Sequence, residues 1–278
     1  MDSIISGKQH TYFEIKKALA ALAAKYPFCE IKSIGRSTAG RDISAIFIGR
    51  SKDYCTFCPS FWGADHLSPL ILLRFAEEIC QSLQSGKGMC GIDIRKALLG
   101  RGIIIMPLIN PDGYDISLRG QDALPPDTAV LKMSGGNLSH WGFNLRGIDL
   151  DKNFFKNYNK IPATKGFGGY APLTEAESVA VASFCRKNSL RHLITLICDN
   201  SGISFSDATG RGIKMAEIIS ATTGFTINLG DNEKNFGAFF AAEFFKPAVK
   251  IGAPGGTVAN LSAGYALLKE ALTLCVLM

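Results

Sequence analysis

The spacing of apolar and polar positions changes along the first half of the chain from helical to strand-like and back. Residues 14–25 repeat apolar positions at helical intervals and stop before Pro27, which predicts a helix. Two runs rich in β-branched residues surround Ser37-Thr-Ala-Gly40, which predicts a hairpin with glycine in its turn. The elements expected after the first helix are strands at 30–36, 42–48 and 54–61 and a helix at 67–83.

The second half begins with an apolar run and then a long stretch of loop signals. Residues 102–109 are apolar throughout, as expected of a central strand covered on both faces, and they end at the turn signal Asn110-Pro-Asp-Gly113. Residues 114–170 are expected to be loop-rich, which is often where binding occurs. Thr174-Glu-Ala-Glu177 has the spacing of a capping box. The elements expected from there on are helices at 174–188, 212–223, 236–245 and 262–275 and strands at 193–198, 225–228 and 248–251.

This alternation of helices and strands predicts an α/β fold, a three-layer α/β/α sandwich around a mixed central sheet. Nothing repeats along the chain, so residues 1–278 are expected to form a single domain. With 278 residues and 47% apolar content, the chain is long enough to bury a sizeable core. The 29 glycines and the low charged fraction of 19% favour many tight turns around a sheet over a helical bundle.

Charge and cysteine content narrow the range of partners and compartments. The net charge of +6 comes from Lys and Arg spread along the chain, so no nucleic-acid partner is expected. No run is long and apolar enough for a membrane span, and the first ten residues lack the pattern of a signal peptide. Eight cysteines in apolar surroundings indicate buried free thiols and a cytoplasmic location. Cys55 and Cys58 have the spacing of half a metal site, but no second pair follows, which favours a buried strand.

Four motifs stand in the order in which zinc carboxypeptidases carry similar ones. They are Ile34-Gly-Arg-Ser-Thr-Ala-Gly-Arg-Asp42, Leu108-Ile-Asn-Pro-Asp-Gly-Tyr114, Arg146-Gly-Ile-Asp-Leu-Asp-Lys-Asn-Phe154 and Tyr170-Ala-Pro-Leu-Thr-Glu-Ala-Glu177. The chain therefore resembles this family over most of its length from residue 30. It is most similar to the bacterial branch that cleaves γ-D-glutamyl-diaminopimelate bonds in cell-wall peptides. The resemblance implies the same sandwich fold.

The resemblance also implies which residues would carry the chemistry. The family binds zinc through a His-x-x-Glu pair and a distant His, and a separate Glu takes the proton of the attacking water. None of the four histidines here is followed three residues later by Glu or Asp. The ligand positions fall on Trp62, Asp65 and Cys198, and the base position falls on Gly252, or on Lys250 with a two-residue gap. No metal or other cofactor and no catalytic residue are therefore expected.

The substrate side of the resemblance falls on a charged pair. The family's Asn-Arg or Asn-His pair, which binds the substrate's terminal carboxylate, corresponds here to Asp151 and Lys152. Lys152 can attract a carboxylate, although the charge of Asp151 beside it partly cancels this attraction. Asp149 and Asn153 in the same motif are expected to hold the loop through side-chain to backbone hydrogen bonds.

These assignments lead to a catalytically inactive carboxypeptidase-like protein whose cleft binds a peptide or a cell-wall fragment. Trp62, Asp65 and Cys198 are then expected to lie together at the strand ends, with Trp62 as a packing residue and Cys198 as a buried thiol. One alternative is an active metallocarboxypeptidase with a rearranged zinc site of Asp65, His66 and Cys198. Another is a fold kept for its outer surface, as an assembly partner.

Overall fold

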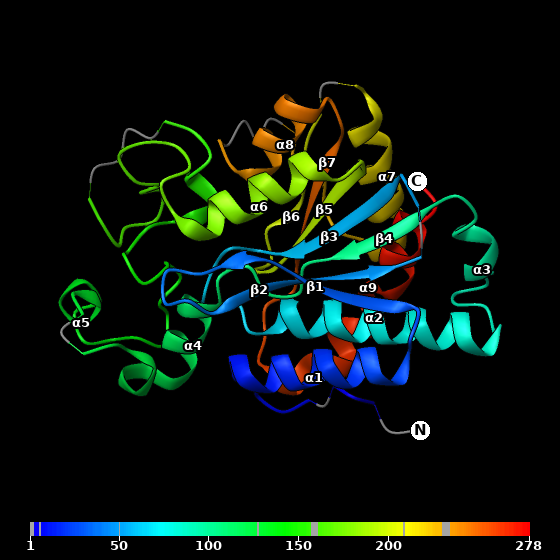
Figure 1. Cartoon of the computed structure of the whole chain (residues 1–278). Coiled ribbons are helices and arrows are strands. Elements are labelled where there is room, and N and C mark those ends of the chain that lie inside the picture. The colour runs from blue at the N-terminus through cyan, green and yellow to red at the C-terminus, as the bar shows by residue number, and fades with distance from the viewer. Residues whose placement is uncertain are drawn as a thin grey trace.

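A mixed sheet of seven strands forms the middle layer of the computed structural model (Figure 1). The structure describes residues 3–5, 7–49, 51–126, 128–156, 161–207, 209–229 and 234–278. The strand order is β1-β2-β4-β3-β5-β7-β6; β4, β3, β5 and β7 are parallel, and β1, β2 and β6 run antiparallel to their neighbours. The strands are β1 (Cys29–Arg36), β2 (Asp42–Ile48), β3 (Tyr54–Pro59), β4 (Gly102–Ile105), β5 (Leu190–Cys198), β6 (Gly202–Ser206) and β7 (Ala248–Ala253).

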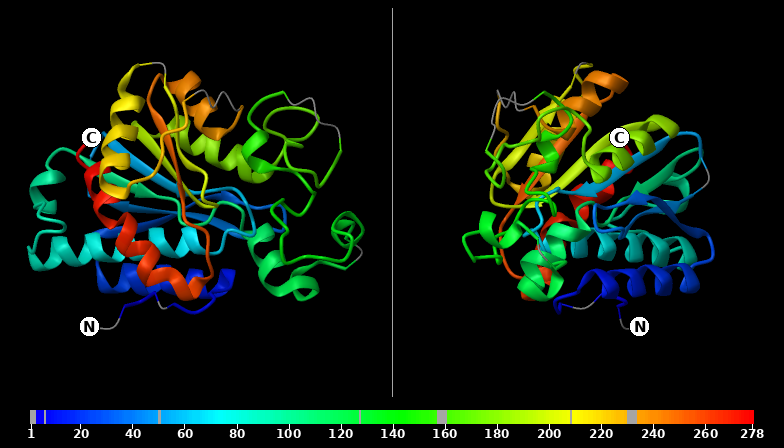
Figure 2. Two further views of the ribbon diagram at one scale, coloured as in Figure 1. Left: turned by 180° about the vertical axis from the view of Figure 1, so that it is seen from behind. Right: turned by 60° about the vertical axis from the view of Figure 1, so that its left-hand side comes forward.

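Helices cover both faces of this sheet, which confirms the predicted α/β/α sandwich (Figures 1 and 2). One face packs against α1 (Tyr12–Lys25), α2 (Leu67–Ser85), α7 (Arg211–Thr223) and α9 (Leu261–Cys275). The other face packs against α6 (Ala176–Lys187) and α8 (Phe236–Phe244). The short helices are α3 (Ile94–Ala97), α4 (Pro111–Arg119) and α5 (Val130–Met133), with 3-10 turns at η1 (Gly120–Ala123), η2 (Leu150–Lys152) and η3 (Val258–Asn260).

Most of the predicted elements appear close to their expected positions, because their apolar runs are the buried strands and helix faces. Helix α1 ends at Lys25 as predicted, and a capping box fixes its start: the Thr11 hydroxyl accepts the Glu14 N–H, and the Glu14 carboxylate accepts the Thr11 N–H at 2.7 Å. Strand β4 is four residues shorter than the run that predicted it. Pro107 has no N–H to continue the ladder.

Helix α4 stands where the sequence was expected to give a turn and then loops. The Asn110 side chain accepts the Gly113 N–H at 2.9 Å, and Pro111 occupies the first helical position. Both are helix-start features, so the turn signal marked an N-cap. Figure 2 shows the segment with α4 and α5 at one end of the sheet. Residues 127 and 157–160 of the predicted loop stretch lie outside the described residues.

The predicted capping box at the start of α6 is wrong. The Glu177 carboxylate accepts hydrogen bonds from the Thr38 N–H at 2.9 Å and from the Thr38 hydroxyl at 3.2 Å, both in the β1–β2 turn. The Glu177 carboxylate therefore binds a residue that is distant in sequence and does not cap the start of α6. Strand β6 was not predicted, and the strand expected at 225–228 forms only a single bridge between Ile203 and Ile227.

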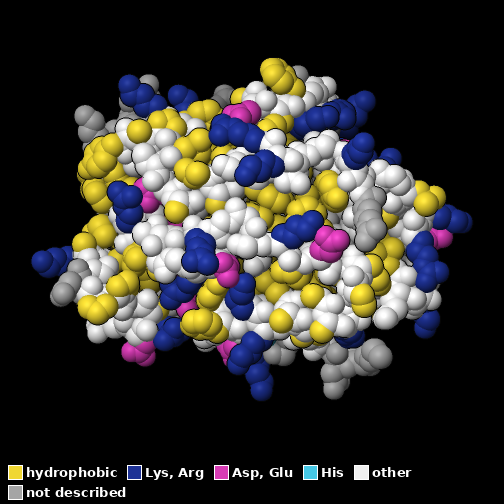
Figure 3. Space-filling model, in the orientation of Figure 1, with side chains coloured by type: hydrophobic (Ala, Val, Ile, Leu, Met, Phe, Trp, Pro, Cys, Tyr) yellow, Lys and Arg dark blue, Asp and Glu magenta, His cyan; other side chains and the backbone are white. Residues whose placement is uncertain are grey.

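Surface charge is scattered over the face shown in Figure 3, where Lys and Arg side chains alternate with hydrophobic and neutral ones. Such scatter differs from the continuous basic stripe that nucleic-acid binding usually needs. Among the described residues, no helix is both long and apolar enough to cross a membrane.

Candidate functional site

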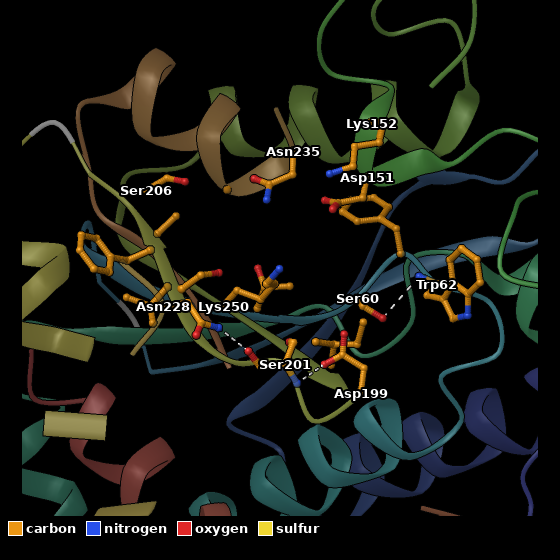
Figure 4. A pocket seen from close by; sticks show the side chains of 18 of the residues that line it. Ser60, Trp62, Asp151, Lys152, Asp199, Ser201, Ser206, Asn228, Asn235 and Lys250 are labelled. Carbon is orange, nitrogen blue, oxygen red and sulfur yellow. Dashed lines mark hydrogen bonds between the residues drawn. The ribbon is translucent and has the colours of Figure 1, made fainter. Parts of the chain in front are cut away.

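A cavity of about 520 Å³ lies over the sheet face formed by β5, β6 and β7, on the side of α8 (Figure 4). We call it the sheet cavity. Its floor carries Thr195 from β5, Ser204 and Ser206 from β6 and Lys250 from β7. Ser60 and Trp62, which follow β3, lie at its other end. The cavity thus extends along the sheet to the strand ends where the sequence placed the site.

Among the described residues, the charged side chains that line the sheet cavity are three carboxylates and three lysines. The lysines are Lys152, Lys165 and Lys250. Two carboxylates accept a backbone N–H from another segment, Asp149 from Gly166 at 2.8 Å and Asp151 from Phe236 at 3.0 Å, and Asp199 accepts the N–H of Ser201 in its own turn at 2.9 Å. These bonds hold the walls in place. The predicted substrate-binding pair, Asp151 and Lys152, therefore lies on the cavity wall, with Asp151 at the start of α8.

Asp65 and Cys198 lie side by side at the ends of the neighbouring strands β3 and β5. The Asp65 carboxylate is almost completely buried and accepts the Ser60 hydroxyl at 3.0 Å, the Ser68 hydroxyl at 2.6 Å and the Cys198 N–H at 3.4 Å. The Ser68 hydroxyl also lies 3.4 Å from Cys198 Sγ. These three donors converge on one carboxylate oxygen, Oδ2, and the Ser68 N–H donates to the other oxygen, Oδ1, at 3.1 Å.

Trp62 belongs to the same turn, since its carbonyl accepts the Asp65 N–H at 3.0 Å. Its indole packs edge-to-face on Phe143, with ring centroids 5.2 Å apart. The ring also lies against Gly142, where a Cβ would be 2.1 Å from indole atoms. Trp62 is therefore a packing residue, and its indole has no atom that could bind a zinc ion.

His66 points away from Asp65 and Cys198. Its Nε2 lies 2.7 Å from the Ser117 hydroxyl, and its ring packs edge-to-face on Tyr114, both residues of α4. The three residues of the alternative zinc site are therefore not brought together. Within the described part of the chain, no group of three or more His, Cys, Asp or Glu side chains could hold a metal ion.

Gly252 and Lys250, the two candidates for the base position, have different surroundings. A Cβ on Gly252 would lie 2.0 Å from the Ser201 hydroxyl oxygen and 2.8 Å from the backbone N and O of Gly202, so no side chain fits there. Lys250 lies two residues earlier on the same strand and lines the sheet cavity. Neither residue presents a carboxylate.

The thiols near the site are poor nucleophiles. Burial raises the pKa of the Cys198 thiol, and the Asp65 carboxylate beside it raises it further. Burial also raises the pKa of Asp65, although its hydrogen bonds oppose this. Burial raises the pKa of Cys55 and of Cys58 to about 12, as expected for thiols of a buried strand and not of a redox or metal pair.

The sequence did not lead us to predict that β6 and the segments after it contribute polar side chains to the wall of the sheet cavity. Ser204 and Ser206 alternate with Ile203 and Phe205, and this period-two pattern was a detectable strand signal. By contrast, the expected loop-holding role of Asn153 is present: its side-chain amide donates to the Gly168 carbonyl and to the Thr174 hydroxyl at 2.9 Å.

The stability of the fold should depend on pH through Asp149. Burial raises its pKa to about 6, and the charge of Asp151 adds to the effect. A carboxyl whose pKa is higher in the folded state contributes stability below its unfolded pKa of about 3.9 and loses it as the pH rises to about 6. This shift corresponds to about 3 kcal/mol. The free energy of unfolding of Asp149→Asn minus that of wild type should therefore increase as the pH rises from 4 to 7, measured by urea unfolding. A difference that does not change with pH would contradict this.

Comparison with known proteins places this geometry among peptidases. A sequence profile described as zinc carboxypeptidase matches residues 15–206. An uncharacterised protein of Bacillus subtilis, YqgT, is 28% identical over 194 residues, and γ-D-glutamyl-L-diamino acid endopeptidase 1 of Lysinibacillus sphaericus is 24% identical over 197 residues. These alignments cover 66% and 67% of this chain but 52% and 50% of the relatives, so the chain spans about half their length. Bovine thrombin-activatable fibrinolysis inhibitor, at 15% identity, superposes with a TM-score of 0.75 over 97% of both chains and shows the same fold.

These matches correct the expectation that no cofactor binds. The sequence profile that matches residues 15–206 is described as zinc carboxypeptidase, so the family points to zinc. The side chains described at the expected ligand positions do not fit that ion, because Trp62 has no donor atom to offer and the Asp65 carboxylate is hydrogen-bonded to Ser60, Ser68 and Cys198.

Proposed function

We propose, from the premise that the chain belongs to the zinc carboxypeptidase family, that its sheet cavity binds a peptide or a cell-wall peptide fragment without hydrolysing it. One observation carries this proposal: a cavity of about 520 Å³ lies along β7, the strand on which we assign the family's base position to Gly252, or to Lys250 with a two-residue gap, and neither residue has a carboxylate. Peptide hydrolysis needs a proton acceptor within hydrogen-bond reach of the attacking water. Binding needs only the cavity.

The Lysinibacillus sphaericus relative, γ-D-glutamyl-L-diamino acid endopeptidase 1, supports peptides with γ-D-glutamyl-L-diamino acid bonds as the ligand class. We assign the contact with the ligand's terminal carboxylate to Asp151 and Lys152 on the cavity wall. Asp151 accepts the Phe236 N–H, which holds this segment against the start of α8. Lys152 beside it provides the positive charge for the carboxylate.

The whole chain is proposed to act as one unit in the cytoplasm. Helices α1 and α9, from opposite ends of the sequence, share one hydrophobic core on the same face of the sheet, which supports a single domain over residues 1–278. All eight cysteines are free, which supports a reducing compartment.

The proposal predicts binding without turnover. The tripeptide L-Ala-γ-D-Glu-diaminopimelate is titrated by calorimetry, and its integrity is followed by mass spectrometry with zinc added. We expect saturable binding and no product above a no-protein control. Lys152→Ala should weaken binding about tenfold, because one charge-assisted contact is lost. Lys17→Ala, on α1 across the sheet, is the matched control and should bind as wild type does.

Chelator-sensitive cleavage of the tripeptide would contradict the absence of hydrolysis. Failure to bind at millimolar concentration would contradict the role of the cavity. If wild type and Lys152→Ala bind the tripeptide equally well, Lys152 does not contact the ligand, although the cavity can still be the binding site.

A further inference from the structure

A second cavity lies at the end of the sheet opposite to Trp62, near the start of β3. Its volume is about 550 Å³, and it opens between β1, the start of β3 and the end of α6 (Figure 1). None of the described residues that line it also lines the sheet cavity. We call it the edge cavity, and its lining includes Lys32, Phe47, Lys52, Tyr54, Phe184 and Lys187.

Three lysines from separate segments surround the edge cavity. Lys32 belongs to β1, Lys52 to the loop between β2 and β3, and Lys187 to the last turn of α6. All three residues are exposed. Among the described residues that line this cavity, none is Asp or Glu. The edge cavity therefore presents charge of one sign, whereas the sheet cavity mixes lysines with carboxylates.

The acidic side chains nearest to two of these lysines in sequence already have partners. The Asp53 carboxylate, next to Lys52, accepts the Arg191 Nε–H at 2.9 Å, and the Arg191 side chain is only 14% exposed. Glu30 pairs with Lys32 at 2.9 Å, but both side chains of this pair are exposed, so water screens the contact. A bound anion can therefore compete for Lys32, and Asp53 is held away from Lys52 by its own partner.

Aromatic rings form the base of the edge cavity and position one of its cations. The Phe47 ring meets the rings of Tyr54 and Phe184 edge-to-face, with centroids 5.8 Å and 5.9 Å apart. Lys32 Nζ lies 4.5 Å from the centroid of the Phe47 ring, a cation–π contact that holds the ammonium group over this base. The Tyr54 N–H donates to the Ser189 carbonyl at 3.0 Å, which ties the chain after α6 to the start of β3. Beside apolar rings, an ammonium attracts an anion more strongly than in open water.

We propose that the edge cavity binds a di- or triphosphate group, whose oxygens contact Lys32, Lys52 and Lys187. A lysine ammonium binds phosphate oxygens as a point charge and needs no planar pairing geometry. Three such charges around one cavity favour a ligand with several negative charges over a single carboxylate. A volume of about 550 Å³ is in the range of small-molecule sites. The group can come as inorganic triphosphate or as part of a nucleoside triphosphate, whose base would add contacts with the aromatic rings.

The test compares inorganic triphosphate, ATP and sulfate by calorimetry at equal, low ionic strength and without added divalent metal. Wild type should bind triphosphate at least about tenfold more tightly than sulfate, because triphosphate presents more negative charge to the three lysines. Lys52→Met and Lys187→Met should each weaken triphosphate binding about threefold, and the double variant about tenfold. Lys17→Met removes an exposed lysine on α1 and should bind triphosphate as wild type does.

The two sources of the phosphate group are separated by ATP. Tighter binding of ATP than of triphosphate would support a nucleoside ligand, and equal or weaker binding would support the phosphates alone. Triphosphate that binds no better than sulfate would overturn the proposal. An unchanged affinity in the double variant, or a loss of triphosphate binding in Lys152→Ala, would also overturn it, because the anion would then bind outside the edge cavity. The wild-type series needs no variant, so it tests the preference for phosphate groups whether or not a variant folds.

Discussion

Glutamate at position 252 should lower the free energy of unfolding by about 2 kcal/mol or more and should not produce a peptidase. The change restores the residue type that the family uses as its base, but the strand has no room for it. A Cβ at Gly252 would lie 2.0 Å from the Ser201 hydroxyl oxygen and 2.8 Å from the backbone of Gly202. Ser201 can change rotamer, whereas Gly202 is paired with Gly252 across the β6–β7 ladder and can move only with its strand.

Urea unfolding of Gly252→Glu and of two companions tests this account. Lys250→Glu places the same side chain on the same strand where it has space, and it should cost less than about 1 kcal/mol. Adding Ser201→Gly to Gly252→Glu should recover only part of the loss, since the contacts with the Gly202 backbone remain. A Gly252→Glu protein as stable as wild type would contradict the steric argument. Release of C-terminal residues by this variant would show that position 252 can hold a functional base.

Most strands were predictable because they are apolar runs in the sequence, whereas some element ends, one cap, helix α4 and strand β6 were not predicted correctly. The run that predicted β4 contains Pro107, where the ladder cannot continue. The carboxylate of Glu177 had the right spacing to cap its own helix, but Thr38, 139 residues away in sequence, takes it. Local patterns cannot weigh a tertiary partner against a local one.

The site was predictable in position more than in detail. Asp65 and Cys198 meet because β3 and β5 are neighbours in the sheet, a consequence of topology that the family resemblance implied. The direction of His66 depends on α4, a helix at residues whose sequence predicts a turn and loops, so the sequence alone does not decide the alternative metal site. The hydroxyls of Ser204 and Ser206 depend on β6, a short strand of alternating polar and apolar residues that was not predicted.

Asp112, which is not one of the residues that line the sheet cavity, joins the β1–β2 turn to the start of α4, and its replacement should have the largest effect on stability of the substitutions considered. It is fully buried and accepts the Ser37 hydroxyl at 2.8 Å, the Ala39 N–H at 2.8 Å and the Arg41 guanidinium at 2.7 Å. The Arg41 side chain is only 16% exposed. Water can therefore do little to replace the lost carboxylate.

We expect Asp112→Ala to lower the free energy of unfolding by about 3 to 5 kcal/mol, because removing one partner of a buried ion pair leaves the other charge and two further donors unsatisfied. Arg41 would retain the longer contact with Asp115, at 3.4 Å, and its position over the Tyr12 ring. The exposed Asp122→Ala is the matched control and should change stability by less than about 0.5 kcal/mol. Arg41→Met combined with Asp112→Ala should cost less than the sum of the two single changes, since the stranded charge is then gone as well. Strict additivity in this cycle, measured by urea unfolding with linear extrapolation, would show that the pair does not act as a unit.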